Sequence, residues 1–158
     1  MRKVLLAILA MLLFASPAIG AESCTQSILA SGPYKVYNIV WVTGAAGGFT
    51  ATELDQPIDG IVMLVEFIPS ATAAPTTLYD VTARNSSGID ILGDSAVAGS
   101  EAYDGVGANL SATVPTDTQL LLNGNYGAVP VMGKLTVDVL NAGNDKGGTI
   151  RIHFLSIR

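Results

Sequence analysis

A single imidazole limits the catalytic chemistry that this chain could carry out. The sequence of 158 residues contains one histidine, His153, and one cysteine, Cys24. A serine or cysteine nucleophile needs a base beside it, so every such pairing would have to use His153. Apolar and polar residues alternate from Ile150 to Phe154, which places His153 on the polar face of a strand together with Arg151. We therefore expect a solvated histidine and no enzymatic activity.

The acidic residues are the other groups that could bind a ligand. Thirteen Asp and Glu against eight Lys and Arg give a net charge of −5, so the chain lacks the basic surface that nucleic acids and anionic membranes require. Two loop regions gather the oxygen ligands that calcium prefers. Neither fits the D-x-D-x-D-G loop, so solvated acidic loops are the alternative, and we assign no catalytic, cofactor-binding or metal-binding residue. The two regions contain Asp90, Asp94, Glu101 and Asp104, and Asn141, Asn144 and Asp145.

The first twenty residues have the pattern of a cleavable, helical signal peptide. Met1–Lys3 is basic, Val4–Phe14 is apolar, and Ala18 and Gly20 fit the small-residue positions before a cleavage site, so the mature chain would begin at Ala21. A helix of eleven apolar residues covers only about half of a ~30 Å hydrocarbon core, which is too short for an anchor. We expect export to the periplasm or the extracellular space and no membrane span in the mature chain.

The lone cysteine would be unpaired in an exported chain. Cys24 lies in a Ser/Thr-rich stretch that we expect to be an N-terminal extension over residues 21–34, after the signal peptide at 1–20 and ahead of one domain over 35–158. Two interpretations are open. The thiol is inert on a frayed end, or it forms a bridge between two protomers.

Period-two alternation predicts strands along most of the mature chain. It is clearest in Lys134–Val139 and Ile150–Phe154, which a long polar turn separates, so we expect these two strands to form a hairpin. Val36–Val42 is apolar on both faces, and Phe49–Leu54 is expected to pair back on it as a second hairpin. A strand of this kind is typically covered on both sides.

The remaining segments complete an all-β pattern. Ile61–Val65 is the longest apolar run of the mature chain and begins a predicted strand of eight residues that ends at Ile68. Leu78–Ala83 alternates so that Tyr79, Val81 and Ala83 share one side. Gly93–Gly107 has no clear period and is predicted to be a long loop. About eight or nine strands, no helix after the leader and seventeen glycines predict a β-sandwich or jelly roll.

Three stretches between Phe49 and Leu155 occur in an order that carries a family resemblance. They are Gln56–Gly60 with the apolar strand after it; Ala74–Thr82 with Gly88–Gly93; and Pro130–Val137 running to Asn141–Asn144 and then Gly148–Ile150. Together they resemble small, mostly uncharacterised proteins encoded by tailed bacteriophages and prophages. The resemblance implies a β-sandwich virion protein, such as a decoration or tail-associated component, with no catalytic residues to carry over. A leader departs from that group, so an exported surface or extracellular binding module, with or without calcium, is the alternative.

The composition also bears on assembly. Apolar residues make up 49% of the chain and charged residues 13%, against about 25% charged residues in an average soluble domain. A small sandwich must place part of that apolar surface outside, and contiguous exposed apolar surface marks an interface. We expect self-association or attachment to a virion or cell-surface assembly. The alternative is that both faces of Val36–Val42 are covered within the protomer, by the other sheet and by the loop Gly93–Gly107.

Overall fold

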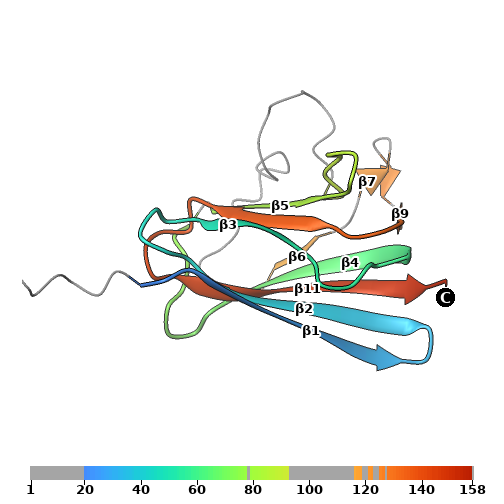
Figure 1. The fold of residues 1–158 in the computed structure, drawn as a ribbon, viewed down its shortest axis with the longest axis horizontal. Helices are drawn as coiled ribbons and strands as arrows, with labels where there is room; N and C mark the ends of the chain where they lie inside the picture. The colour runs from blue at the N-terminus through green and yellow to red at the C-terminus, as the bar shows by residue number, and fades with distance from the viewer. Residues whose placement is uncertain are drawn as a thin grey trace, which may run out of the picture.

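A computed structural model describes residues 20–77, 79–92, 116–118, 121–122, 125–126 and 128–157. Within these residues the chain is all-β and contains no helix. Two antiparallel sheets face each other as two layers (Figure 1), and one cluster of buried side chains from both sheets fills the space between them. The predicted all-β, sandwich-like fold is therefore confirmed. The predicted leader lies almost entirely outside the described residues, as does the loop Gly93–Gly107.

The larger sheet has six strands, and its centre is occupied by the last strand of the chain. β11 lies between β2 and β4 and pairs with both along most of its length. In spatial order the sheet contains β1 (Ser23–Ser31), β2 (Tyr34–Val42), β11 (Gly147–Ser156), β4 (Gly60–Pro69) and β6 (Thr116–Thr118), and β9 (Val129–Val131) also pairs with β4.

The second sheet has three strands, with β10 (Thr136–Leu140) between β3 (Phe49–Glu53) and β5 (Asp80–Arg84). A separate two-stranded ladder joins β7 (Leu121–Leu122) to β8 (Asn125–Tyr126). No helix in the described part of the chain is long and apolar enough to cross a membrane.

The core follows the alternation of the sequence. In β11 Ile150, Ile152 and Phe154 face the second sheet, and Arg151 and His153 face outward, as the pattern predicts. In β5 Val81 and Ala83 are buried on the predicted side, and Thr82 on the other side is buried as well. The largest fully buried side chains are Trp41, Tyr37, Phe67, Phe154, Ile39, Leu54, Ile58, Leu92, Leu135 and Ile152.

Both predicted hairpins are wrong, because the chain changes sheets at these connections. β3 pairs with β10 rather than with β2, and β10 and β11 lie in different sheets. In a sandwich each strand buries its apolar row against the opposite sheet, so two strands that follow each other in the chain can lie in different sheets and still cover both rows.

The domain begins earlier than the predicted residue 35. β1 lies inside the predicted extension 21–34 and pairs with β2 from Ser23 to Ser31 without a register shift. Its outward-facing residues are mostly serine and threonine, so the sequence alone does not distinguish this edge strand from a polar extension. β2 is correspondingly an internal strand, and its outward face is not fully covered by the described residues, since Val40 is 48% exposed.

Candidate functional site

The one histidine takes part in a series of side-chain hydrogen bonds that crosses three strands of the larger sheet. The Tyr34 hydroxyl of β2 contacts Nδ1 of His153 in β11. Nε2 of His153 lies 2.7 Å from Oε2 of Glu66 in β4, and an Arg151 guanidinium nitrogen lies 3.7 Å from the same oxygen. Sequence analysis placed His153 correctly on the outer face with Arg151, but Tyr34 and Glu66 were not predicted.

The chemistry of the partners limits the roles of the two imidazole nitrogens. A carboxylate only accepts, so Nε2 of His153 donates to Glu66, and the imidazole tautomer with its proton on Nε2 accepts from the Tyr34 hydroxyl at Nδ1. The His153 side chain is only 16% exposed, so the prediction of a solvated histidine is wrong. The reason is that partners on the two neighbouring strands cover the ring from both sides.

The order hydroxyl, imidazole and carboxylate resembles that of a catalytic triad. A triad also needs a place for a substrate next to the hydroxyl. Neither of the two cavities described in this structure is lined by Tyr34, His153 or Glu66. The hydrogen bonds join side chains of three adjacent strands and so form a cross-link between β2, β11 and β4.

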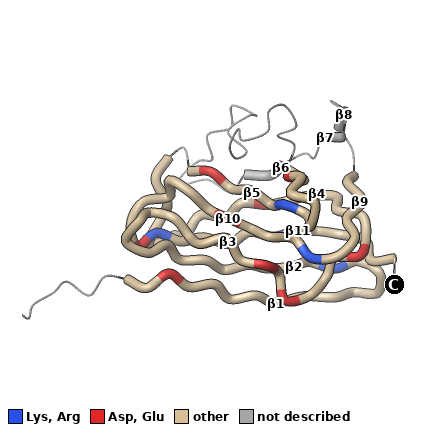
Figure 2. Tube along the Cα trace, turned by 45° about the horizontal axis from the view of Figure 1, so that its top comes forward, with Lys and Arg blue, Asp and Glu red and all other residues tan. Residues whose placement is uncertain are grey.

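Exposed apolar side chains gather around this cross-link on the outer face of the larger sheet. The strand register places them in adjacent rows across β1, β2, β11 and β4, on either side of His153. Acidic and basic residues are scattered over the described chain rather than gathered on one face (Figure 2). The outer-face patch consists of Leu29, Tyr34, Ile61, Met63 and Leu155, whose exposed fractions are 64%, 40%, 38%, 49% and 37%.

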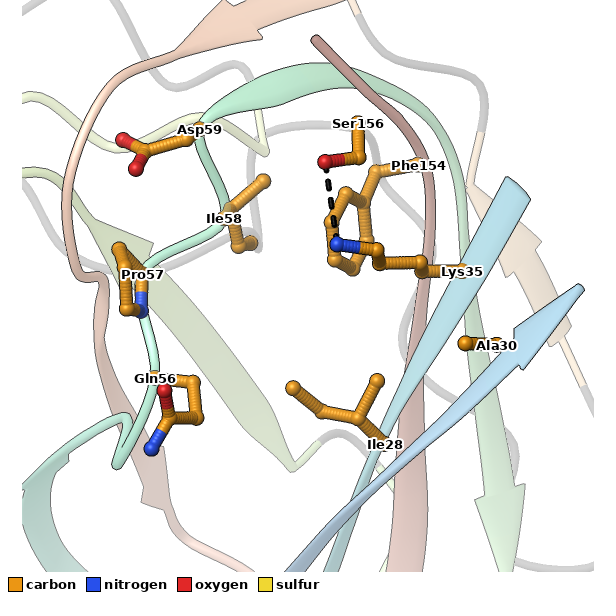
Figure 3. Close-up of a pocket in the computed structure, with 9 residues that line it drawn as sticks. All are labelled: Ile28, Ala30, Lys35, Gln56, Pro57, Ile58, Asp59, Phe154 and Ser156. Atoms are coloured by element: carbon orange, nitrogen blue, oxygen red, sulfur yellow. Dashed lines mark hydrogen bonds between the residues drawn. The ribbon is translucent and has the colours of Figure 1, made fainter. Parts of the chain in front are cut away.

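A cavity of about 370 Å³ opens at the end of the sandwich, between β1, β2 and β11 on one side and the segment before β4 on the other. We call it the end cavity, and Figure 3 shows Ile28 and Ile58 pointing into it from opposite sides. It is lined by Ile28, Ala30, Lys35, Gln56, Pro57, Ile58, Asp59, Phe154 and Ser156.

Lys35 is the charged group that points into this cavity. The register places it opposite Ala30 and Phe154, on the core side of β2, where the other side chains are apolar. Its ammonium donates to Oγ of Ser156 at 3.1 Å, and among the described residues no carboxylate lies within ion-pair distance of it. The Asp59 carboxylate, which is also on the cavity lining, points away from Lys35 in Figure 3. The lining of the end cavity thus combines apolar residues with the Lys35 ammonium, the polar Gln56 and Ser156, and Asp59.

Cys24 lies in β1, opposite Trp41, with its side chain on the core side and partly buried. Burial raises the pKa of the Cys24 thiol above 9.0, and the nearby charge of Asp55 raises it further. A raised pKa keeps the thiol protonated and poorly reactive at neutral pH. The position favours the inert-thiol interpretation, in a paired strand rather than on a frayed end.

The predicted calcium-binding regions are only partly described. Asp94, Glu101 and Asp104 lie outside the described residues. Oδ1 of Asp90 accepts hydrogen bonds from the backbone N–H groups of Ala83 and Leu92, so it stabilises the turn after β5. In the second region, Asn141 donates to the Asp80 carboxylate. The described ranges contain no cluster of three or more side chains arranged to hold a metal ion.

Comparisons with known proteins add no family for this chain. No family model, no curated protein and no solved structure matches it. The resemblance to phage proteins therefore stays a prediction.

One feature of the site left a signal in the sequence. Lys35 occupies a position that alternates with Tyr37 and Ile39, which predicts an inward-facing cation at a strand end.

Proposed function

We propose that this chain is a non-enzymatic structural protein of the phage type, a decoration or tail-associated component that attaches to a larger assembly through its surface. The observation that carries the proposal is the outer-face patch. Five large apolar side chains, all more than a third exposed, lie together on one face of a regular sheet. Such contiguous apolar surface is typical of a face that another protein covers.

The arrangement around His153 supports a role in attachment. Both imidazole nitrogens are engaged by side chains of the neighbouring strands. The resulting cross-link holds β2, β11 and β4 in a fixed register beneath the patch. A rigid apolar face loses less conformational freedom on docking than a mobile one.

The proposal is tested on particles purified from the bacterium whose genome encodes the chain. Phage or prophage particles banded in a density gradient should contain the chain, and neighbouring genes should encode capsid, portal or tail proteins. The variant Met63→Lys, which places a charge in the patch, should be lost from the particles. Ser86→Lys, at an exposed turn far from the patch in sequence, is the control and should stay bound. Recovery of the wild-type chain only from particle-free fractions would contradict the proposal.

The leader is part of the proposal as well. We expect cleavage after Gly20 when the full chain is made in a bacterium, because the basic and apolar runs ahead of it fit the signal-peptide pattern. N-terminal sequencing of the accumulated protein should begin at Ala21. A product that begins at Met1 would argue against export.

The end cavity favours a second candidate function, an exported binding module. Apolar walls and the Lys35 ammonium suit a small amphipathic anion, and a volume of about 370 Å³ lies within the range of small-ligand sites. Octanoate is a suitable probe in isothermal titration calorimetry. Binding that Lys35→Met weakens at least tenfold, together with a gene neighbourhood free of virion genes, would favour this candidate. If octanoate gives no heat of binding with the wild-type protein, this second candidate function is contradicted.

A further inference from the structure

β1 is a long edge strand without the usual protection against pairing. It pairs with β2 and with no other described strand, and Figure 2 shows it along the margin of the larger sheet. Its nine residues from Ser23 to Ser31 contain no charged residue and no proline, and its register with β2 is regular throughout. Edge strands normally carry a lysine, a proline or a bulge that prevents another strand from adding to them.

The edge strand of the smaller sheet that lies nearest to β1 is β3, and side chains cover part of its backbone. The Gln26 side chain of β1 donates to the Glu53 carbonyl of β3 at 3.2 Å. Glu22, just before β1, accepts from the backbone N–H of Thr50 at 3.1 Å. Side chains from the N-terminal region thus occupy backbone groups of β3, whereas the outer edge of β1 itself is left open among the described residues.

The hydrogen-bond pattern shows which groups of β1 face that open edge. Ser156 N–H donates to the Pro33 carbonyl, so the odd-numbered residues of β2 bond to β11 and the even-numbered residues bond to β1. The partners of those even-numbered residues are the odd-numbered residues of β1. The N–H and C=O groups of the even-numbered residues therefore point outward, and in the described chain no backbone hydrogen bond reaches them. These residues are Cys24, Gln26, Ile28 and Ala30.

We propose that β1 pairs antiparallel with β1 of a second copy of this chain, about a two-fold axis at Ser27. This register sets Cys24 opposite Ala30 and Gln26 opposite Ile28 of the other copy. It joins every outward N–H of one strand to an outward C=O of the other, and any shifted register leaves some of them unpaired. Even-numbered residues of one strand oppose even-numbered residues of the other, so the side chains that face the core in each protomer stay on the same face of the joined sheet.

The strand itself favours a second copy as the occupant. A two-fold axis sets β1 against an identical strand, and β1 has no charge that would repel its own copy. The junction also extends the outer face, because both outer-face patches lie on the same side of the joined sheets. The pairing uses the edge and leaves the patches exposed, so it does not depend on the proposed attachment to a larger assembly.

A charge-swap experiment tests the register. Ser27 lies at the axis in a pair without hydrogen bonds, where opposed side chains approach most closely. Sedimentation equilibrium of the mature chain at micromolar concentration should give the mass of two protomers. Ser27→Lys and Ser27→Glu alone should each raise the dissociation constant by roughly tenfold or more, and their equimolar mixture should recover the dimer. Ser86→Lys is the control and should leave the dimer intact.

A backbone substitution provides the second test. Ala30→Pro removes an outward N–H and leaves the ladder to β2 in place, which is where an edge strand tolerates proline. It should weaken the dimer while the far-UV circular dichroism stays unchanged, and Ala30→Ser should do neither. Dithiothreitol should have no effect, because the register keeps the two Cys24 residues at opposite ends of the junction.

Three results would overturn the pairing. The wild-type chain could keep the mass of one protomer as its concentration rises, the dimer could survive both Ser27→Lys and Ala30→Pro, or Met63→Lys rather than the edge variants could dissociate it. The last result would place the contact at the outer-face patch. Absence of the chain from virions would contradict the proposed function without affecting these masses, so the two failures are distinguishable.

Discussion

The first and the last strand of the larger sheet have similar lengths and opposite positions. β11 has β2 on one side and β4 on the other, and its inward side chains Ile150, Ile152 and Phe154 are at most 2% exposed. β1 has a neighbour on one side only, and its inward side chains Cys24 and Ile28 are only partly buried. Similar strand geometry thus gives a central element at one end of the chain and an accessible edge at the other.

The difference teaches that the end of this sequence completes both layers. In the larger sheet β11 separates β2 from β4, and in the smaller sheet β10 separates β3 from β5. β2 therefore meets β4, and β3 meets β5, only through the last two strands. Such non-local pairing delays the closing of the core until the C-terminal residues are present.

The largest expected effect comes from removing either strand. A chain ending at Lys146 lacks β11, so we expect no cooperative thermal unfolding in near-UV circular dichroism. A chain starting at Pro33 lacks β1 and should still unfold cooperatively, with a lower midpoint because Tyr37 loses its bond to Gln26. The comparison fails if the chain without β11 retains a sharp transition or the chain without β1 shows none.

Single core substitutions sharpen the comparison. Ile152 in β11 is fully buried, and Ile152→Ala should cost about 3 kcal/mol of unfolding free energy through lost contacts and a cavity. Ile28→Ala in β1 should cost about 1 kcal/mol, because this side chain is only partly buried and already borders the end cavity. Urea denaturation measures both values. Equal losses would show that β1 contributes to the core as much as β11.

The outer face of β11 should respond less than its inner face. Sequence analysis alone predicts that His153→Ala changes stability by no more than about 0.5 kcal/mol. The bonds to Tyr34 and Glu66 raise the expected loss to about 1–2 kcal/mol, because a largely covered carboxylate loses its donor. Tyr34→Phe should cost about 1 kcal/mol in the same urea measurement. If neither variant lowers the unfolding free energy, the prediction of a solvated histidine would be supported.

The smallest effect concerns a carboxylate on β10. Burial raises the pKa of Asp138, and the charge of Arg84 opposes this only in part. A raised pKa favours the protonated form in the folded state, so this stabilising contribution is complete below the unfolded value of 3.8 and is lost as the pH rises through the folded value. Asp138→Asn should therefore be more stable than the parent at pH 7, by about 0.5 kcal/mol at most because solvent screens the group. The difference should vanish near pH 3, and a pH-independent difference would contradict the assignment.

Much of the candidate site depends on contacts that no local pattern contains. His153 could be placed on its face from five residues of sequence, but Tyr34 lies 119 positions away and Glu66 lies 87 positions away. The end cavity likewise joins β1, β2, β11 and the segment before β4. Backbone hydrogen bonds between strands are the same for every residue type except proline, so the sequence does not indicate which strand pairs with which.

The sequence by itself determined several of the long strands and which of their faces are buried, because a period of two is a local property of the chain. Ile150, Ile152 and Phe154 face the core as their alternation predicts, and so do Val81 and Ala83. Only the tertiary structure decided that β1 belongs to the sheet, that β10 and β11 face each other across the core, and that one edge is left open. These features depend on pairing between distant segments, where burial of the combined apolar surface outweighs any local preference.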